Sequence, residues 1–244
     1  MINPKINKEI ASLWHEYFDK YELGKTPVSI EEFDNVKAPM FYDEPKQGGI
    51  LFIGMNPSSG TNGGNKIIKE DFPSIGDLDK YLLWKNIKTN ESGIDMMVTF
   101  EKEWIKKYPF FKPMRDISLK TGRIFQHVDL FLFRETNQNS FIRRIESKGG
   151  ILNKFGVDQI MIFHKVLDSL NPEVMVVANA KASQIFRKEY RDELVFDDSM
   201  GLHYFKRKIP IFFSGMLTGQ RALDNHSRER LDWHVMRSVS GLSK

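Results

Sequence analysis

The chain has 244 residues, enough to build a large hydrophobic core without disulfide or metal staples. It contains no cysteine, which excludes disulfides, thiolate nucleophiles and cysteine-based zinc or iron–sulfur sites. Lysine and arginine exceed aspartate and glutamate by four and the pI is near 9.0, so contact with phosphates is permitted but not required. We expect a single domain over residues 1–244.

No segment has the pattern of a targeting sequence or a membrane span. The opening residues, MINPKINKEI, lack the apolar stretch of a signal peptide. No run approaches the roughly 18 consecutive apolar residues that a transmembrane helix needs. We therefore expect a soluble, cytoplasmic protein without a membrane partner, and we expect it to be a monomer.

The first half of the chain has one strand signal among several helical ones. Apolar residues recur at helical spacing from Ile6 to Phe18 and predict an N-terminal amphipathic helix. Residues 50–53 are all apolar and predict a buried strand, which runs into the turn of residues 54–59. About 70 residues without a convincing strand follow. Their helical patterns at 78–87 and 96–108 predict a long helical insertion after the first strand.

The second half of the chain alternates strands with helices. Further core strands are predicted at residues 127–133, 174–178 and 209–213, and a short hairpin at 194–196 and 203–205. Helices are predicted at residues 158–170, 181–190 and 227–239.

Four short, nearly all-apolar strands that alternate with helices are typical of a mainly parallel sheet covered on both faces. The sequence therefore predicts an α/β fold, a three-layer sandwich around a four-stranded central sheet. Because the carboxyl ends of parallel strands meet at one edge, we expect a ligand site there. The residues expected at this edge are 55–59, 134–137, Asn179 and 214–218.

Several common catalytic motifs are missing. The glycine-rich segment 54–66 lacks phosphate-loop spacing because Lys66 is followed by Ile67, and it also fails the G-x-G-x-x-G pattern. The six histidines show neither H-E-x-x-H nor H-x-E spacing, so we expect no metal and no cofactor. Ser58 and Ser59 lack the G-x-S-x-G context of a nucleophile, and their hydroxyls can equally cap the next segment.

Two basic clusters have more than one interpretation. Residues 206–208, Lys-Arg-Lys, are best explained as a solvated hairpin turn, although they are also suited to phosphate contacts. Arg221, His226, Arg228 and Arg230 adjoin the expected ligand edge, which makes them the better phosphate candidates. A plain charged helix face explains this second cluster equally well.

The turn Gly54-Met55-Asn56-Pro57-Ser58 resembles the first motif of the uracil-DNA glycosylase superfamily, in the branches that carry G-[IM]-N-P-[GS] there. Residues 127–134 resemble that family's second-strand segment, and residues 170–180 its third strand and following helix. Residues 209–227 lie where its second motif and downstream helix belong. The resemblance spans residues 49–237 and implies hydrolysis of the N-glycosidic bond of a base flipped out of DNA.

The resemblance assigns expected roles to individual residues. Asn56 is the expected catalytic amide, which orients water without having to lose a proton. Backbone N–H groups near Met55 are expected to stabilise a departing pyrimidine anion. Phe72 is the candidate for stacking on the base, and an anchor for its own loop is the alternative. The expected base pocket comprises Gly54, Met55, Pro57, Ser58, Phe72, Asp129 and Asn179, and the expected phosphate contacts are Ser59, Arg221 and His226.

The chain departs from the family pattern at two places. Ser214, Gly215, Met216 and Leu217 stand where the second motif often has His-Pro-Ser, so the imidazole donor is missing. We expect Met216 or Leu217 to act as an apolar wedge in the duplex. Asp129 stands where a base-reading asparagine is usual, and an ionised carboxylate only accepts hydrogen bonds. It would therefore repel the uracil O4, and we expect a base other than uracil to be preferred.

The sequence thus favours a DNA glycosylase-like α/β protein acting on a deaminated or damaged base, with DNA as its partner. A catalytically silent member that binds nucleic acid or nucleotides is the first alternative. An unrelated α/β enzyme for a small phosphorylated or glycosidic ligand is the second. Retention of Asn56 favours catalysis, whereas the missing motif-two histidine favours a silent binder.

Overall fold

The computed structural model describes residues 4–19, 35–58, 78–90, 92–219 and 221–241. The chain forms two compact units, each assembled from three separate stretches. The first, here called the helical unit, comprises Met1–Pro45, Asn56–Tyr108 and Phe131–Ser169. The second, the sheet unit, comprises Lys46–Met55, Pro109–Leu130 and Leu170–Lys244. The expectation of one domain over the whole chain stays a prediction.

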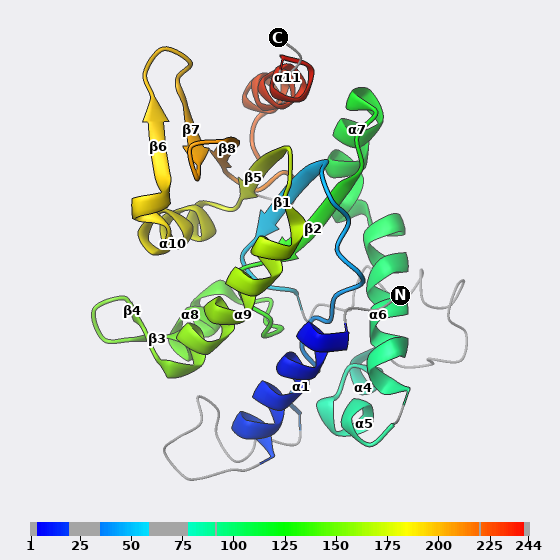
Figure 1. Ribbon diagram of the computed structural model, residues 1–244. Coiled ribbons are helices and arrows are strands. Elements are labelled where there is room, and N and C mark those ends of the chain that lie inside the picture. The colour runs from blue at the N-terminus through cyan, green and yellow to red at the C-terminus, as the bar shows by residue number, and fades with distance from the viewer. Residues whose placement is uncertain (1–3, 20–34, 59–77, 91, 220, 242–244) are drawn as a thin grey trace. The chain divides into compact units, whose positions relative to one another are not determined.

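The sheet unit is built around one mixed sheet (Figure 1). Its strands are β1 (Ile50–Gly54), β2 (Phe125–Asp129), β5 (Val174–Ala178), β6 (Leu194–Asp197), β7 (Leu202–Phe205) and β8 (Ile209–Ser214). They lie in the order β2-β1-β5-β8-β7-β6. The first four pair in parallel, whereas β7 pairs antiparallel with both β8 and β6.

The prediction of a four-stranded sheet is therefore corrected to six strands. The four predicted core strands are the parallel ones, and the predicted hairpin adds two more. The hairpin joins the sheet through β7, which pairs with β6 on one side and with β8 on the other. The pairing with β8 places His203 opposite Ile211. An antiparallel strand can extend a parallel sheet without a crossover helix.

Helices flank this sheet, so the α/β class is confirmed, and the arrangement is compatible with a three-layer sandwich. They are α7 (Lys112–Thr121), α10 (Ala180–Glu189) and α11 (Asn225–Gly241), with short 3₁₀ turns η1 (Pro109–Phe111) and η2 (Arg191–Glu193). α10 and α11 contact β5, and α7 contacts β2. Pro113 opens α7 and the left-handed Gly122 ends it, as expected for a proline at the first turn and a glycine past the last.

The second predicted strand, 127–133, is shifted toward the N-terminus in the structure. β2 spans Phe125–Asp129, and the next residues leave the ladder although they are buried. Their backbone groups bond elsewhere: the N–H groups of Leu132 and Phe133 donate to the Gln159 side chain, and the Leu132 carbonyl accepts from Met40. An apolar run cannot distinguish a strand from a buried loop whose backbone is satisfied by a side chain.

The helical unit contains α1 (Pro4–Phe18), α4 (Leu78–Tyr81), α5 (Trp84–Lys88), α6 (Gly93–Lys107), α8 (Gln138–Ile145), α9 (Lys154–Leu170) and the small hairpin β3 (Glu146–Ser147) with β4 (Ile151–Leu152). The predicted helix 78–87 is split in two. Residues 82–84 interrupt it because Leu82 accepts from Ala38 and Trp84 donates to Val36 along the backbone. The aromatic rings of Trp14, Phe18, Phe133 and Phe155 pack together in the core of this unit.

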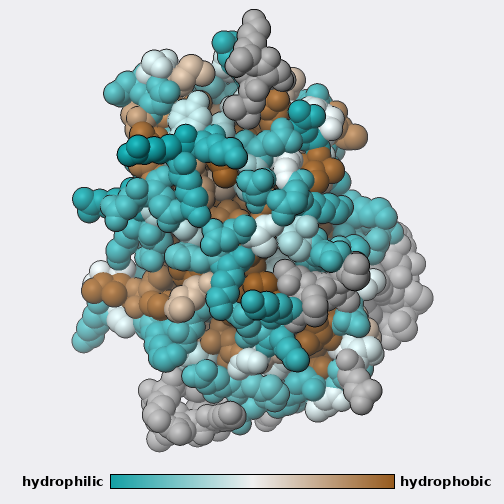
Figure 2. Space-filling model, in the orientation of Figure 1, coloured by the Kyte–Doolittle hydropathy of each residue, from teal (hydrophilic) through white to brown (hydrophobic). Residues whose placement is uncertain are grey.

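The surface is mainly hydrophilic in the view of Figure 2, with apolar residues in small, separate groups. Within the described residues, none of the helices combines the length and apolarity needed to cross a membrane.

Candidate functional site

The candidate site begins at the strand where the sheet order reverses. β1 has β2 on one side and β5 on the other, so successive parallel strands depart in opposite directions from it. In open α/β sheets, ligands bind outside the carboxyl ends of the strands at this switch point. The register places Asp129 of β2 opposite Gly54 of β1, and Ser214 of β8 opposite Ala178 of β5. Predicted site residues therefore end three of the four parallel strands.

Gly54, His127 and Asp129 form a tightly packed group at the β1–β2 end of this edge. A Cβ atom on Gly54 would overlap the Asp129 carboxylate oxygen Oδ1 and would lie 3.0 Å from His127 Nε2. Asp129 Oδ1 and His127 Nε2 are 3.8 Å apart, and both side chains are almost fully buried. Glycine at the end of β1 thus makes room for the carboxylate beside it.

Burial controls the protonation of His127. It lowers the pKa of the imidazole to about 4, so the ring is neutral near pH 7. The edges of Phe110 and Phe111 flank it, and its Nδ1 has no hydrogen-bond partner among the described residues. Asp129 therefore has a neutral imidazole, not a cation, as its neighbour on β2.

Asn56 lies just past β1, in the helical unit. Its side-chain nitrogen Nδ2 donates to three backbone carbonyls, those of Pro57 (3.1 Å), Phe133 (3.2 Å) and Glu135 (2.7 Å). Carbonyls require a donor, so these contacts fix which end of the amide faces them. The oxygen Oδ1 accepts no hydrogen bond from the described residues, and the side chain is only half-buried. Asn56 is thus held in one orientation with its acceptor open.

The loop of residues 133–136 is joined to the Asn56 turn by further bonds. The Glu135 N–H donates to the Pro57 carbonyl over 3.1 Å, and the hydroxyls of Ser58 and Thr136 are 3.0 Å apart. Pro57 itself is buried and Ser58 is exposed. These contacts bring together two of the segments that the sequence predicted at one edge.

Buried polar side chains hold this loop from behind. Gln159 of α9 is fully buried, and its Oε1 accepts from the N–H groups of Leu132 (2.9 Å) and Phe133 (3.0 Å). Arg134 is paired with Glu101 of α6 and also donates to the Ala38 carbonyl over 2.9 Å. Both members of the ion pair are buried, so each compensates the charge of the other.

Sequence reasoning did not assign a role to Gln159 or Glu101. Gln159 occupies the same helical face as the apolar residues Phe155, Ile162 and Val166, and a polar residue at such a position needs a buried partner. That spacing was an available signal for Gln159. Glu101 also lies on an apolar helical face, with Met97, Val98 and Trp104 at i−4, i−3 and i+3, so the same signal was available for it.

Asn179 follows β5 as predicted, but its side chain is the N-cap of helix α10. Its Oδ1 accepts from the backbone N–H groups of Lys181 (2.9 Å) and Ala182 (3.0 Å), which caps the N-terminus of α10. Reading a base with Asn179 would compete with this cap.

The second-motif segment lines a pocket of about 410 Å³ in the sheet unit. Its walls come from the end of β8, the start of α10 and the face of α11, namely Ala180, Phe213, Ser214, Gly215, Leu223, Ser227 and Leu231. The Ser214 hydroxyl lies 2.9 Å from the Gly215 carbonyl. Leu217 is buried, whereas Met216 is half-buried, so Met216 is the more accessible of the two wedge candidates.

The remaining predicted residues fall in two groups. Ser59 and Phe72 lie outside the described residues. Arg221 and His226 are exposed near the start of α11, and His226 Nδ1 is 3.9 Å from a Glu229 carboxylate oxygen. Across the described residues, no cluster of three or more histidine, aspartate or glutamate side chains is arranged to hold a metal ion.

Neither a comparison with models of known protein families nor one with curated protein sequences finds a match to this chain.

Proposed function

We propose that this protein is a DNA glycosylase that hydrolyses the N-glycosidic bond of a deaminated or damaged base flipped out of DNA. The observation that carries the proposal is the geometry of Asn56. Three carbonyls hold its Nδ2, and its Oδ1, which accepts from none of the described residues, is oriented as an acceptor for a water molecule. A neutral amide has no proton to lose near pH 7, so the residue can position water over a wide pH range.

The support behind Asn56 favours a functional role for the turn. Buried Gln159 and the buried Arg134–Glu101 pair fix the loop that supplies two of the three carbonyls. Preorganised acceptors reduce the reorganisation needed when charge develops in a transition state.

Asp129 has the base-reading role in this proposal. Its carboxylate oxygens can accept from an exocyclic amine or an imino N–H, and the neutral His127 imidazole lies 3.8 Å from Oδ1. The preferred base would then present a donor to Asp129, unlike the O4 of uracil.

The experiment that tests the proposal offers the purified protein a panel of duplex and single-stranded DNAs, each with one altered base. Alkali then cleaves any abasic sites. We expect strand breaks for at least one base with the parent and none with Asn56→Ala. Asn86→Ala is the matched control, because it removes an exposed amide of α5 that donates to the Lys80 carbonyl and has no contact with the Asn56 turn among the described residues. A panel without breaks, or breaks that persist in Asn56→Ala, would contradict the proposal.

A catalytically silent nucleic-acid binder is the second candidate. It is favoured by the second-motif segment, where Ser214 replaces the imidazole and its hydroxyl is engaged by a backbone carbonyl. Salt-dependent DNA binding without abasic product would identify this candidate.

A further inference from the structure

The outer face of α11 carries basic and aromatic side chains at regular helical spacing. Successive intervals of four, three and four residues put them on one side of the helix. They are His226, Arg230, Trp233 and Arg237, and all four are exposed. The opposite side is apolar and buried, through Leu231, Val235 and Val239.

Trp233 is the most unusual member of this face, with 52% of its surface exposed. The Arg237 guanidinium lies over its ring, 5.2 Å from the centroid, and the ring of His234 meets it edge-on at 4.9 Å. By contrast, Trp14 and Trp84 are buried. Arg237 thus covers one face of the indole, and the exposed part of the side chain is available to a flat partner.

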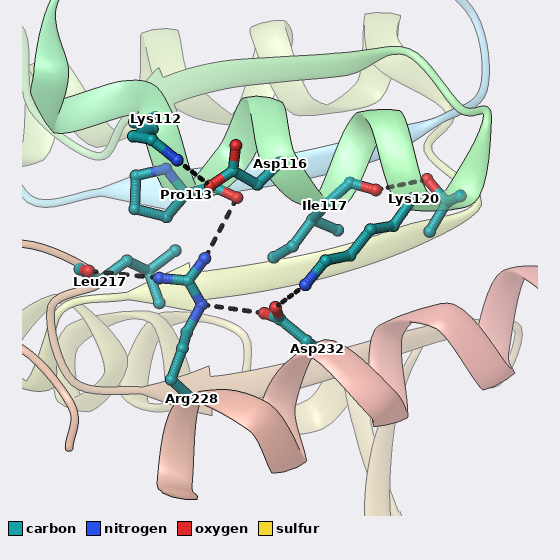
Figure 3. Close-up of polar contacts among 9 residues, drawn as sticks. Lys112, Pro113, Asp116, Ile117, Lys120, Leu217, Arg228 and Asp232 are labelled. Carbon is teal, nitrogen blue, oxygen red and sulfur yellow. Dashed lines mark hydrogen bonds and ion pairs between the residues drawn. The ribbon is translucent and has the colours of Figure 1, made fainter. Parts of the chain in front are cut away.

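Helix α7 packs against the side of α11 that carries Arg228, Leu231 and Asp232, away from Trp233, and polar bonds join the two helices there (Figure 3). Arg228 of α11 donates to the Pro113 carbonyl over 3.3 Å and to Asp232 over 2.9 Å. Lys120 of α7 reaches the same Asp232 carboxylate over 3.0 Å. Helix α7 thus supports α11 from behind, and the exposed side of α11 that carries His226, Arg230, Trp233 and Arg237 is here called the α7–α11 face.

Helices α7 and α11 together carry a net positive charge. Over the two helices, lysine and arginine exceed aspartate and glutamate by three, while the whole chain has an excess of only four. Asp116 is paired with Lys112, and Asp232 with Arg228 and Lys120, so two of the three carboxylates are already neutralised. Positive charge beside an exposed indole is complementary to a polyanion that carries flat rings.

We infer that the α7–α11 face binds a single strand of nucleic acid, with Trp233 stacking on one base and Arg230 and Arg237 contacting phosphates. From His226 to Arg237 the helix rises by about 16 Å, long enough to contact several nucleotides of a strand. The inference rests on the proposed function and deepens it by giving the DNA strand a path.

The test is a binding measurement with a 5′-fluorescein-labelled oligothymidylate, followed by fluorescence anisotropy over a range of salt concentrations. We expect Trp233→Ala to weaken binding about tenfold, as loss of one base–aromatic stack does. Trp233→Phe keeps a ring and should bind within about threefold of the parent. Arg237→Glu should reduce the salt slope by about 0.7 for the lost phosphate contact. Lys188→Glu, the same charge change on the exposed side of α10, is the matched control and should have little effect.

Tryptophan emission gives an independent readout on unlabelled oligonucleotide. Stacking on Trp233 should quench it in the parent, and Trp233→Phe should reduce the quenching to what Trp233→Phe/Trp104→Phe leaves, because Trp14 and Trp84 are buried and Trp104 is half-buried.

The outcomes separate this inference from the proposed function. Binding that depends on Trp233, without any abasic product, supports the inference and removes the catalytic proposal. If the parent forms abasic product and Trp233→Ala binds DNA as well as the parent does, the inference is overturned and the catalytic proposal stands. The inference is also overturned if the parent fails to bind at low salt, or if Trp233 instead mediates self-association in the absence of DNA.

Discussion

A methyl group at position 54 would occupy space that the Asp129 carboxylate already fills. We expect Gly54→Ala to destabilise the protein by about 2 kcal/mol, as overpacking in a buried region does. Equilibrium unfolding in urea measures the change. The double variant Gly54→Ala/Asp129→Ala lacks the carboxylate that the methyl group would overlap. Its loss of unfolding free energy should therefore be smaller than the sum of the losses in the two single variants. Strict additivity would show that the contact at the end of β1 does not constrain residue 54.

His127 predicts a pH dependence of stability. Its pKa is lowered by burial to about 4 in the folded state, against about 6.5 when unfolded, so below pH 6.5 the unfolded chain takes up the proton first. Stability should therefore fall between pH 6.5 and pH 4, by about 2 kcal/mol from pH 7 to pH 4.5. His127→Leu should remove this part of the pH dependence. If parent and variant lose the same stability over that range, His127 is not buried in its neutral form.

Asp129 predicts a preference among bases. Asp129→Asn adds a donor, so the variant should gain activity on uracil, whose O4 accepts, relative to bases that present an amine. Excision rates on matched oligonucleotides, each with one altered base, measure the ratio. An unchanged ratio would remove Asp129 from the base pocket.

At the scale of the elements, the loop after β2 depends on α9. Gln159→Leu leaves the N–H groups of Leu132 and Phe133 without an acceptor, so we expect a loss of about 2–4 kcal/mol in unfolding free energy. Gln159→Glu keeps an acceptor oxygen and should cost less. The Asn56 side-chain amide protons should exchange faster in Gln159→Leu than in the parent, since their carbonyl partners lie on that loop. Equal exchange in the two proteins would show that α9 does not hold the Asn56 turn.

The sequence predicted elements better than it predicted their ends and connections. β5 has its predicted bounds, because an apolar run that is buried along its whole length is specified by sequence alone. The predicted bounds of β2 were wrong because the side chain of Gln159, far away in the sequence, accepts the backbone hydrogen bonds of residues 132–133 in place of a neighbouring strand. The split between α4 and α5 also depends on distant residues, since backbone bonds from 36–38 compete with the helical bonds. Contacts of this kind leave no local periodicity.

For the molecule as a whole, the sequence did not reveal how the segments are grouped. The chain passes from the sheet unit to the helical unit between Met55 and Asn56, inside the motif that carries the family resemblance. Local pattern locates Asn56 after a strand, but only tertiary structure shows which carbonyls hold its amide. The predicted residues therefore include Asn56 and Asp129 but not the buried side chains that support them.

The central claim is that Asn56 directs water to the glycosidic bond. The most direct measurement is the single-turnover rate of abasic-site formation by the parent and by Asn56→Ala, with saturating protein so that DNA occupancy is equal. We predict a loss of about 100-fold or more in this rate, with binding of the DNA nearly unchanged. Equal rates in the two proteins would contradict the account.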